Sequence, residues 1–257
     1  LDRGEASLRA FPERSVDAAT ARDYRGLIDR RAAGEPVAYL IGRREFWGRD
    51  FAVDPRVLLP RPETEHLVEA VLEHLREPRR GCLAVPREEP LRLLDVGTGS
   101  GILAVTLVAE LVATRPRVHG VAVDIDPGPL EVTRANAHRH DVADRVACVR
   151  GDLTCAVDLR RFEVVVSNPP YVASDSTEVA ADVRAHEPHR ALFAADRGRA
   201  ALVHLLDAAS SLRPGALLAL EIGHDQGDWL RQQVAASDGL DLLDLVRDYA
   251  GWERTAI

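Results

Sequence analysis

A short apolar segment that continues directly into a run of glycines is the feature that most constrains the fold of this chain. Residues 91–96 are Leu-Arg-Leu-Leu-Asp-Val, a pattern typical of a buried β-strand. Gly97-Thr98-Gly99-Ser100-Gly101 follow at once, and an apolar helix is predicted from Ile102 to about Ala113. Glycines allow the backbone to approach a ligand, and the helix N-terminus offers free N–H groups. The order strand, glycine turn, helix therefore predicts an α/β fold with a nucleotide-like ligand at this turn.

The spacing of the glycines restricts the kind of ligand. The pattern is Gly-x-Gly-x-Gly, whereas dinucleotide-binding proteins carry Gly-x-Gly-x-x-Gly, and no lysine follows as it does in a phosphate-binding P-loop. This compact form, with Asp95 ahead of Gly97, favours S-adenosylmethionine as the ligand. Two interpretations of Asp95 stay open, since its carboxylate would either brace the glycine turn or touch the ligand.

Two further strands are predicted to end in acidic residues at the same edge of the sheet. The second strand, 118–123, leads to Asp124 and Ile125, and an acid in this position is suited to bind ribose hydroxyls. The third strand, 146–149, leads through Gly151 to Asp152 and Leu153. We expect Asp152 to accept an adenine amino group and Leu153 to pack on the adenine ring. The alternatives are a surface acid at 124 and a solvated turn at 152.

The fourth predicted strand, 162–167, ends abruptly in Asn168-Pro169-Pro170-Tyr171. Two prolines cannot continue a strand ladder, so they hold the chain open and stiff after Asn168. The Asn168 side-chain oxygen and the Pro169 carbonyl then offer two acceptors, and Tyr171 a flat ring, for a planar NH2-bearing group. A proline-rich turn that only caps the strand is the alternative. In the strand order 3-2-1-4-5 the first and fourth strands are neighbours, so this motif is predicted to face the glycine turn across one crevice.

The remaining segments complete the expected organisation. Residues 1–33 are predicted to form a helical N-terminal segment capped by Asp17, residues 34–58 a connector of short strands forming a β-hairpin, and residues 59–257 the ligand-binding domain. Residues 61–65 either line the cofactor pocket or cap a helix that begins at Pro62. Later elements are expected as an exposed loop at 76–90, a long loop at 172–192 with a helical turn near 179–183, helices at 200–212 and 228–236, and strands at 216–222, 240–249 and 252–257. Together with the four strands above, these segments predict a seven-stranded, doubly wound, mostly parallel α/β sheet.

Composition and charge exclude several classes of protein. The 257 residues are 46% hydrophobic and 29% charged, as in an ordinary soluble domain, and a net charge of −8 argues against broad binding of nucleic-acid backbones. No apolar run approaches the ~20 residues of a membrane span, and no leader pattern opens the chain. The three cysteines, Cys82, Cys148 and Cys155, have neither zinc nor disulfide spacing, which favours a reducing compartment. The sequence contains no Met, so the initiator is missing and a fragment of a longer chain is one expectation.

Histidine spacing gives no support for a metal site. His138 and His140 occupy alternate helix positions that do not share a face. His186 and His189 flank a proline and have no third ligand nearby in the sequence. We therefore predict no bound metal.

Several longer motifs extend over the chain from about Gly34 to its C-terminus. They are Gly34-Glu35-Pro36, Arg44-Glu45-Phe46-Trp47-Gly48, Leu59-Pro60-Arg61-Pro62-Glu63-Thr64-Glu65, the glycine turn after Asp95, Val123-Asp124, Ser167 to Tyr171, Val183-Arg184, Glu187-Pro188, Glu221-Ile222-Gly223-His224 and Asp248-Tyr249. Together they make the chain resemble the release-factor glutamine methyltransferases, the HemK/PrmC family of class I S-adenosylmethionine enzymes. The family usually carries a helical N-terminal domain about twice as long as the segment before Gly34, so we expect part of that domain to be absent or diverged here.

The resemblance implies a Rossmann-like class I methyltransferase fold and methyl transfer from S-adenosyl-L-methionine, with S-adenosyl-L-homocysteine as product. The acceptor would be the glutamine side-chain amide in the Gly-Gly-Gln motif of a peptide chain release factor. Residues 59–257 would form the methyltransferase domain, in a cytoplasmic monomer that binds neither membrane nor nucleic acid directly. Alternatives are a nucleic-acid methyltransferase acting on a flipped-out adenine amino group and a non-catalytic cofactor-binding scaffold.

The implied site residues fall into three sets. The catalytic residues would be Asn168, Pro169 and Tyr171, and the substrate-binding residues Asn168, Pro169, Pro170 and Tyr171. The cofactor would be bound by Gly97, Thr98, Gly99, Ser100, Gly101, Asp124, Ile125, Asp152, Leu153 and Asn168.

Overall fold

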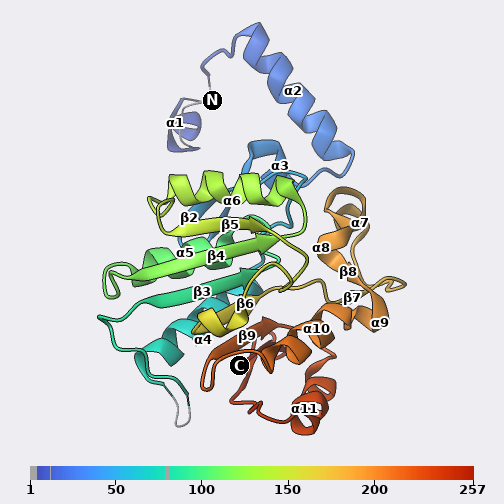
Figure 1. Ribbon diagram of the computed structural model, residues 1–257. Coiled ribbons are helices and arrows are strands. Elements are labelled where there is room, and N and C mark those ends of the chain that lie inside the picture. The colour runs from blue at the N-terminus through green and yellow to red at the C-terminus, as the bar shows by residue number, and fades with distance from the viewer. Residues whose placement is uncertain (1–4, 12, 79–81) are drawn as a thin grey trace.

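A seven-stranded sheet forms the centre of the computed structural model, which describes residues 5–11, 13–78 and 82–257 (Figure 1). The order across the sheet is β10-β11-β9-β6-β3-β4-β5. The strands are β3 (Leu91–Val96), β4 (Val118–Asp124), β5 (Val146–Arg150), β6 (Val164–Ser167), β9 (Leu217–Glu221), β10 (Leu245–Arg247) and β11 (Glu253–Ala256). All neighbouring pairs from β9 to β5 are parallel, and β11 is antiparallel to both β9 and β10. The predicted doubly wound, mostly parallel sheet is confirmed.

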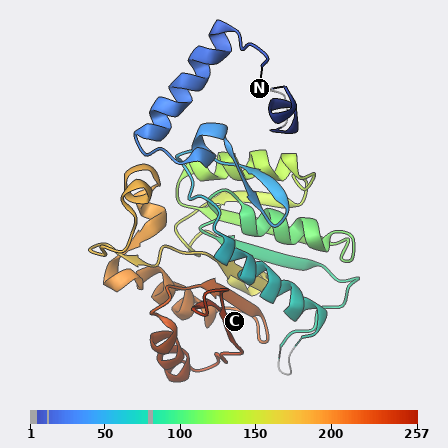
Figure 2. The same ribbon diagram turned by 180° about the vertical axis from the view of Figure 1, so that it is seen from behind.

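Helices cover both faces of this sheet, which explains why its central strands are apolar almost throughout. One face carries α4 (Glu65–Arg76), α5 (Ile102–Leu111) and α6 (Pro127–Arg139), and the other carries the short η2 (Leu159–Arg161), α10 (Ala200–Ala209) and α11 (Gly227–Ala236) (Figures 1 and 2). Successive residues of β3 point to opposite faces, so Leu93 belongs to the first core and Leu94 to the second.

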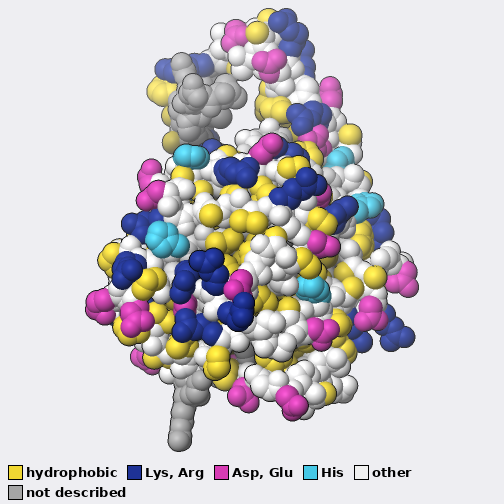
Figure 3. Space-filling view, in the orientation of Figure 1, with side chains coloured by type: hydrophobic (Ala, Val, Ile, Leu, Met, Phe, Trp, Pro, Cys, Tyr) yellow, Lys and Arg dark blue, Asp and Glu magenta, His cyan; other side chains and the backbone are white. Residues whose placement is uncertain are grey.

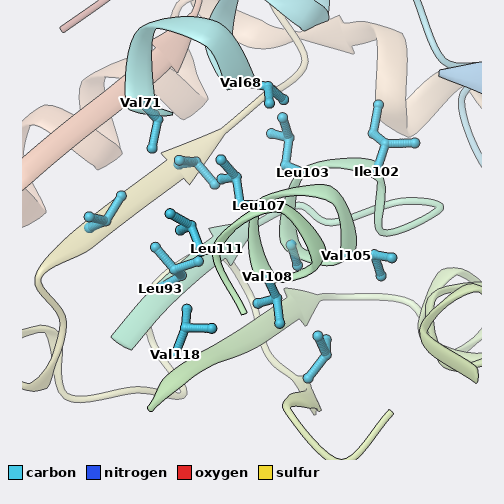
Figure 4. Close-up of a cluster of buried hydrophobic side chains, with 14 of the residues drawn as sticks. Val68, Val71, Leu93, Ile102, Leu103, Val105, Leu107, Val108, Leu111 and Val118 are labelled. Atoms are coloured by element: carbon cyan, nitrogen blue, oxygen red, sulfur yellow. The ribbon is translucent and has the colours of Figure 1, made fainter. Parts of the chain in front are cut away.

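The first core fixes the helix that follows the glycine turn. Figure 4 shows side chains of α5 gathered with Val68 and Val71 of α4 and with Leu93 of β3. Leu103 and Leu107 of α5 are at most 2% exposed. Because residues 102–108 of α5 are all buried, the turn at the N-terminus of this helix is held in a rigid position.

The described part of the N-terminal segment contains two helices, in agreement with the helical prediction. They are α1 (Glu5–Ala10) and α2 (Ala18–Ala32), and α2 extends away from the sheet (Figures 1 and 2). The Asp17 carboxylate accepts the backbone N–H groups of Ala19 and Thr20, so the predicted N-cap is confirmed.

The connector differs from its prediction in one element. Residues Val37–Ile41 form a short helix, α3, in place of the expected strand. A five-residue apolar run does not distinguish strand from helix, and here Pro36 precedes the first turn while Gly42, with φ 71°, ends it. The hairpin itself is confirmed, with β1 (Arg43–Phe46) paired to β2 (Arg49–Ala52). The proposed domain boundaries at 33 and 58 stay predictions.

Two later segments also differ from expectation. The long loop after β6 contains α7 (Ala181–His186), α8 (His189–Leu192) and α9 (Ala195–Gly198), and a parallel pair of very short strands, β7 (Val172–Ala173) and β8 (Phe193–Ala194), closes it. The first closing strand is only Leu245–Arg247, shorter than the predicted 240–249. None of the helices in the described part of the chain is long and apolar enough to cross a membrane.

Candidate active site

A cavity of about 490 Å³ lies at the carboxyl ends of the central strands, a size typical of small-ligand sites. Strand register pairs Val96 with Ser167, so the residues that follow them, Gly97 and Asn168, emerge side by side. Both line the cavity, and the predicted juxtaposition of the two motifs is confirmed. The predicted site residues in the cavity wall are Gly97, Gly99, Asp124, Ile125, Asp152, Leu153, Asn168 and Pro170.

The glycine turn presents bare backbone to this cavity. Gly97 and Gly99 have φ values of 72° and 56°, and a Cβ built on either would meet no atom within 4 Å. The backbone N–H groups of Gly97 and Thr98 both donate to the Val123 carbonyl at 2.9 Å, which fixes the turn on β4. A ligand can therefore approach the turn more closely than it could approach any residue with a side chain. This open, rigid cradle suits an adenosine-type cofactor.

Asp95 lies beneath the turn, where it holds the turn together. Its carboxylate accepts the Thr98 hydroxyl at 2.7 Å and the Ala104 N–H at 3.1 Å, and its side chain is 1% exposed. Of the two interpretations left open by the sequence, the structure supports bracing. Thr98 and Ser100 are buried, and Gly101 packs against Thr133 of α6, so these three shape the turn from behind.

The buried Asp95 carboxyl should make stability depend on pH. Burial raises its pKa from 3.8 to about 6, although the Thr98 and Ala104 hydrogen bonds lower it. The folded state therefore binds the proton more tightly than the unfolded chain, so this stabilisation is full below pH 3.8 and is lost as pH rises past about 6. Relative to Asp95→Asn, the wild type should lose up to about 3 kcal/mol of unfolding free energy between about pH 4 and 7. Urea unfolding of both proteins across this pH range measures the difference. The same change of unfolding free energy with pH in both proteins would contradict the prediction.

Asp124, at the end of β4, joins the glycine turn to the next helix. One carboxylate oxygen accepts the Gly99 N–H at 3.1 Å, and the other accepts the Asp126 N–H, also at 3.1 Å. Burial raises the pKa of Asp124, against the lowering effect of these hydrogen bonds. Each oxygen keeps a further lone pair, which leaves acceptors for ligand hydroxyls.

The cavity also contains residues that the sequence did not single out. They include Val57 and Leu58 of the connector, Arg190, Phe193 and Ala195 of the long loop, and Ala201 and His204 of α10. His204 lies 2.9 Å from the Thr154 hydroxyl through Nε2. No local motif marks these positions, because they reach the cavity only through tertiary folding.

Asn168 is held by a residue from far away in the chain. Its Nδ2 donates to the Thr64 hydroxyl at 3.2 Å. Thr64 is the last residue of a short 3-10 helix, η1 (Pro62–Thr64), which leads into α4. The predicted helix start at Pro62 is confirmed, and the 61–65 motif supports Asn168 from behind the cavity wall. Tyr171 donates its hydroxyl to Glu221 Oε1 at 2.9 Å, and burial raises the Tyr171 pKa well above its usual value.

The long loop is fastened to the segment just before η1 by a buried carboxylate. Glu187, whose side chain is 1% exposed, accepts the Leu59 N–H at 3.0 Å and pairs with Arg61 at 2.5 Å. This contact brings together two of the motifs noted in the sequence. It also fixes Pro188 and the following residues over the cavity.

Gly198 allows the loop to pack against the Asn-Pro-Pro-Tyr segment, and its replacement should be costly. Its φ is 80°, and an added Cβ would lie 2.1 Å from the Tyr171 carbonyl oxygen. We expect Gly198→Ala to lower the unfolding free energy by about 3 kcal/mol or more, from backbone strain and overpacking together. Gly239→Ala is the matched control, because φ there is 86° with no neighbour within 4 Å, and about 1 kcal/mol is expected. Thermal and urea unfolding compare the two, and equal losses would contradict the packing role.

Within the described ranges, no group of three or more His, Cys, Asp or Glu residues is arranged to hold a metal ion.

Comparison with family models identifies two regions of the chain. Residues 81–203 match the methyltransferase small domain, and residues 1–42 match the PrmC N-terminal domain. The second match includes α3 as well as the N-terminal segment before Gly34.

Curated relatives of this chain carry the name release factor glutamine methyltransferase, among them the following three proteins. The Nitratidesulfovibrio vulgaris protein is 41% identical over 95% of this chain and 79% of its own length. The Koribacter versatilis protein is 42% identical over 89% of this chain and 77% of its own length. The Escherichia coli protein is 35% identical over 99% of this chain and 86% of its own length.

Solved structures with low sequence identity share the fold. A methyltransferase from Pyrococcus furiosus superposes with a TM-score of 0.53 at 18% identity, covering 91% of this chain and 96% of that one. A ribosomal protein L11 methylase from Lactobacillus delbrueckii superposes with a TM-score of 0.52 at 20% identity, covering 79% of this chain and 81% of that one.

Proposed function

Since this chain belongs to the release factor glutamine methyltransferases, we propose that it methylates the glutamine side-chain amide in the Gly-Gly-Gln motif of a peptide chain release factor. It is an S-adenosyl-L-methionine-dependent methyltransferase. The observation that carries the proposed acceptor is Asn168, which lines the cofactor cavity next to Gly97 while its Nδ2 is committed to Thr64. Its Oδ1 is thereby left as an acceptor for a substrate N–H.

Different residues of the cavity would bind different parts of the cofactor. Bound S-adenosyl-L-methionine supplies an electrophilic methyl group on a sulfonium, and S-adenosyl-L-homocysteine leaves as product. Gly97 and Gly99 offer bare backbone, and Asp124 offers carboxylate lone pairs to the ribose hydroxyls. Asp152 would accept the adenine amino group, with Leu153 and Ile125 packing beside the base. Thr98, Ser100 and Gly101 keep the turn in shape.

The acceptor amide needs orientation more than it needs a base. Its nitrogen is a poor nucleophile, because the lone pair is delocalised into the carbonyl. Asn168 Oδ1 and the Pro169 carbonyl would accept the two N–H bonds, which aligns the nitrogen with the methyl group and stabilises positive charge as it develops. Pro170 stiffens this slot, and Tyr171 shapes it while its hydroxyl is bound to Glu221. The methylated amide then loses its proton to water without a dedicated base.

Charge favours a protein acceptor over a nucleic acid. The net charge is −8, and the face drawn in Figure 3 has one compact group of basic side chains, with basic and acidic side chains otherwise interspersed. A backbone-tracking surface would need a broader basic area. We further propose a cytoplasmic enzyme that acts as a monomer.

The test is transfer of labelled methyl groups to purified release factor, with a Gln→Ala change in its Gly-Gly-Gln motif as control. Label is expected on the unmodified factor and not on the control. Adenine-containing RNA and DNA are assayed in parallel. Label on nucleic acid with none on release factor would overturn the proposed acceptor and favour the adenine alternative.

A further inference from the structure

A buried polar group lies directly behind Asn168, on the side away from the cavity. It comprises Thr64 from η1 and Glu221 from the end of β9, both 0% exposed, and the hydroxyl of Tyr171. Burying a hydroxyl and a carboxylate is costly unless they form hydrogen bonds with each other or with a neighbouring group. Thr64 and Glu221 do not line the cavity, whereas Asn168 does, so their role lies in the residues that they contact.

The Glu221 carboxylate sets the direction of the hydrogen bonds in this group. Its Oε1 accepts the Tyr171 hydroxyl at 2.9 Å, while Oε2 is buried without a close hydrogen-bond partner. Burial raises the pKa of Glu221, and the side chains of Thr64 and Tyr171, together with the charge of Arg254, lower it. A hydrogen bond that lowers the pKa of a carboxyl group is one that its carboxylate form accepts, so toward Glu221 the Thr64 hydroxyl is the donor. The Thr64 hydroxyl proton is therefore directed toward Glu221.

The remaining contact of Thr64 is with Asn168. Once its proton is directed to Glu221, the Thr64 oxygen can act toward Asn168 only as an acceptor. The contact of 3.2 Å is then the bond donated by Asn168 Nδ2. With Nδ2 held there, the amide cannot rotate by half a turn, and Oδ1 is the atom left for an incoming N–H.

We propose that Thr64 and Glu221 are positioning residues that fix the amide of Asn168 in its acceptor orientation. This inference rests on the proposed function, in which Asn168 Oδ1 receives an N–H of the substrate amide. In the rotated amide, the NH2 group would meet the NH2 group of the substrate, donor against donor, and binding in the reactive geometry would be lost. Thr64 thus acts through Asn168 and does not touch the reacting atoms.

The direct test removes only the Thr64 hydroxyl. Thr64→Val keeps the shape of the side chain, and we expect kcat for methylation of release factor to fall about tenfold or more, with little change in the Kd for S-adenosyl-L-methionine. Thr64→Ser restores a hydroxyl and should recover most of the rate. Thr106→Val is the matched control, because Thr106 is also 0% exposed and its hydroxyl has no hydrogen-bond partner within the described structure. Its kcat should equal that of the wild type.

A double-mutant cycle separates positioning from a general loss of structure. If Thr64 acts through Asn168, adding Thr64→Val to Asn168→Ala should produce no further loss of kcat. Glu221→Gln places a donor in the group and should reproduce the effect of Thr64→Val. Its control is Glu163→Gln, since Glu163 is a buried carboxylate at the opposite end of the sheet, paired with Arg92 and Arg213.

The outcomes distinguish this inference from the proposed function. Wild-type protein that does not label release factor overturns the proposed function and this inference with it. Wild-type protein that labels release factor, with a Thr64→Val variant of equal kcat, overturns the inference alone. Losses that multiply in the double variant also overturn it, because they would show that Thr64 acts independently of Asn168.

Discussion

Replacing Asn168 with alanine is expected to lower kcat for methylation of release factor by about 10²–10³-fold, the usual effect of removing one transition-state hydrogen bond in a closed site. The loss arises because the developing charge on the amide nitrogen would have only the Pro169 carbonyl as a partner. The Kd for S-adenosyl-L-methionine should change little, since the glycine turn and Asp124 are untouched by the substitution. Single-turnover kinetics measures the first quantity and calorimetric titration the second.

The substitution Asn168→Asp is a second test of the role of this residue. Aspartate keeps an acceptor but cannot donate to Thr64 and brings a negative charge near Glu221, so intermediate activity is expected. An Asn168→Ala variant that turns over at the wild-type rate would remove Asn168 from the mechanism. Equal losses of kcat and cofactor affinity would instead place Asn168 mainly in cofactor binding.

The strand order and its ligand-binding edge could be predicted from sequence because both depend on local patterns. The apolar run 91–96 and the run 162–167 are each long enough to mark a buried strand, and each ends in residues that stop a strand. Parallel sheets bind ligands where neighbouring strands end. Once these two strands were neighbours, Gly97 and Asn168 had to share a cavity.

The contacts that hold Asn168 could not be predicted in this way. Thr64 is 104 residues away in sequence, and Glu221 meets Tyr171 across 50 residues. Such pairs depend on how η1 and β9 pack around the loop, which periodicity and spacing do not specify. The motifs containing Thr64 and Glu221 were visible, yet a motif alone does not say whether a residue faces the ligand or supports one that does.

The helix α3 shows the corresponding limit for local structure. Residues 37–41 are apolar and bounded by Gly34 and Gly42, which suits a short strand as well as a helical turn. Packing decided between them: Tyr39 is buried and donates its hydroxyl to the Val57 carbonyl at 2.6 Å. That contact connects the helix to residues of the connector that line the cavity, so the segment contributes indirectly to the site.

Replacing Asp124 with alanine is expected to weaken binding of S-adenosyl-L-methionine by about 100-fold, or roughly 2.7 kcal/mol, which corresponds to two lost hydrogen bonds to a charged group. The carboxylate is proposed to bind the ribose hydroxyls, and it also accepts the backbone N–H groups of Gly99 and Asp126. Alanine removes the ligand contacts and leaves both N–H groups without their acceptor. Calorimetric titration with the cofactor measures the loss, and Asp144→Ala, at an exposed carboxylate, serves as control.

Asp124→Asn decides which part of the carboxylate matters, because each oxygen accepts a different backbone N–H. An amide can replace one oxygen only, and its NH2 group must then face the N–H of either Gly99 or Asp126, donor against donor. We therefore expect the asparagine variant to lose most of the affinity that the alanine variant loses, even though its shape is nearly unchanged. An asparagine variant with wild-type affinity would mean that one hydrogen bond to the ribose is sufficient and that the glycine turn keeps its geometry without Asp124. In that case the rigidity of the turn would have to come from Asp95 and from the Val123 carbonyl, which accepts the N–H groups of Gly97 and Thr98.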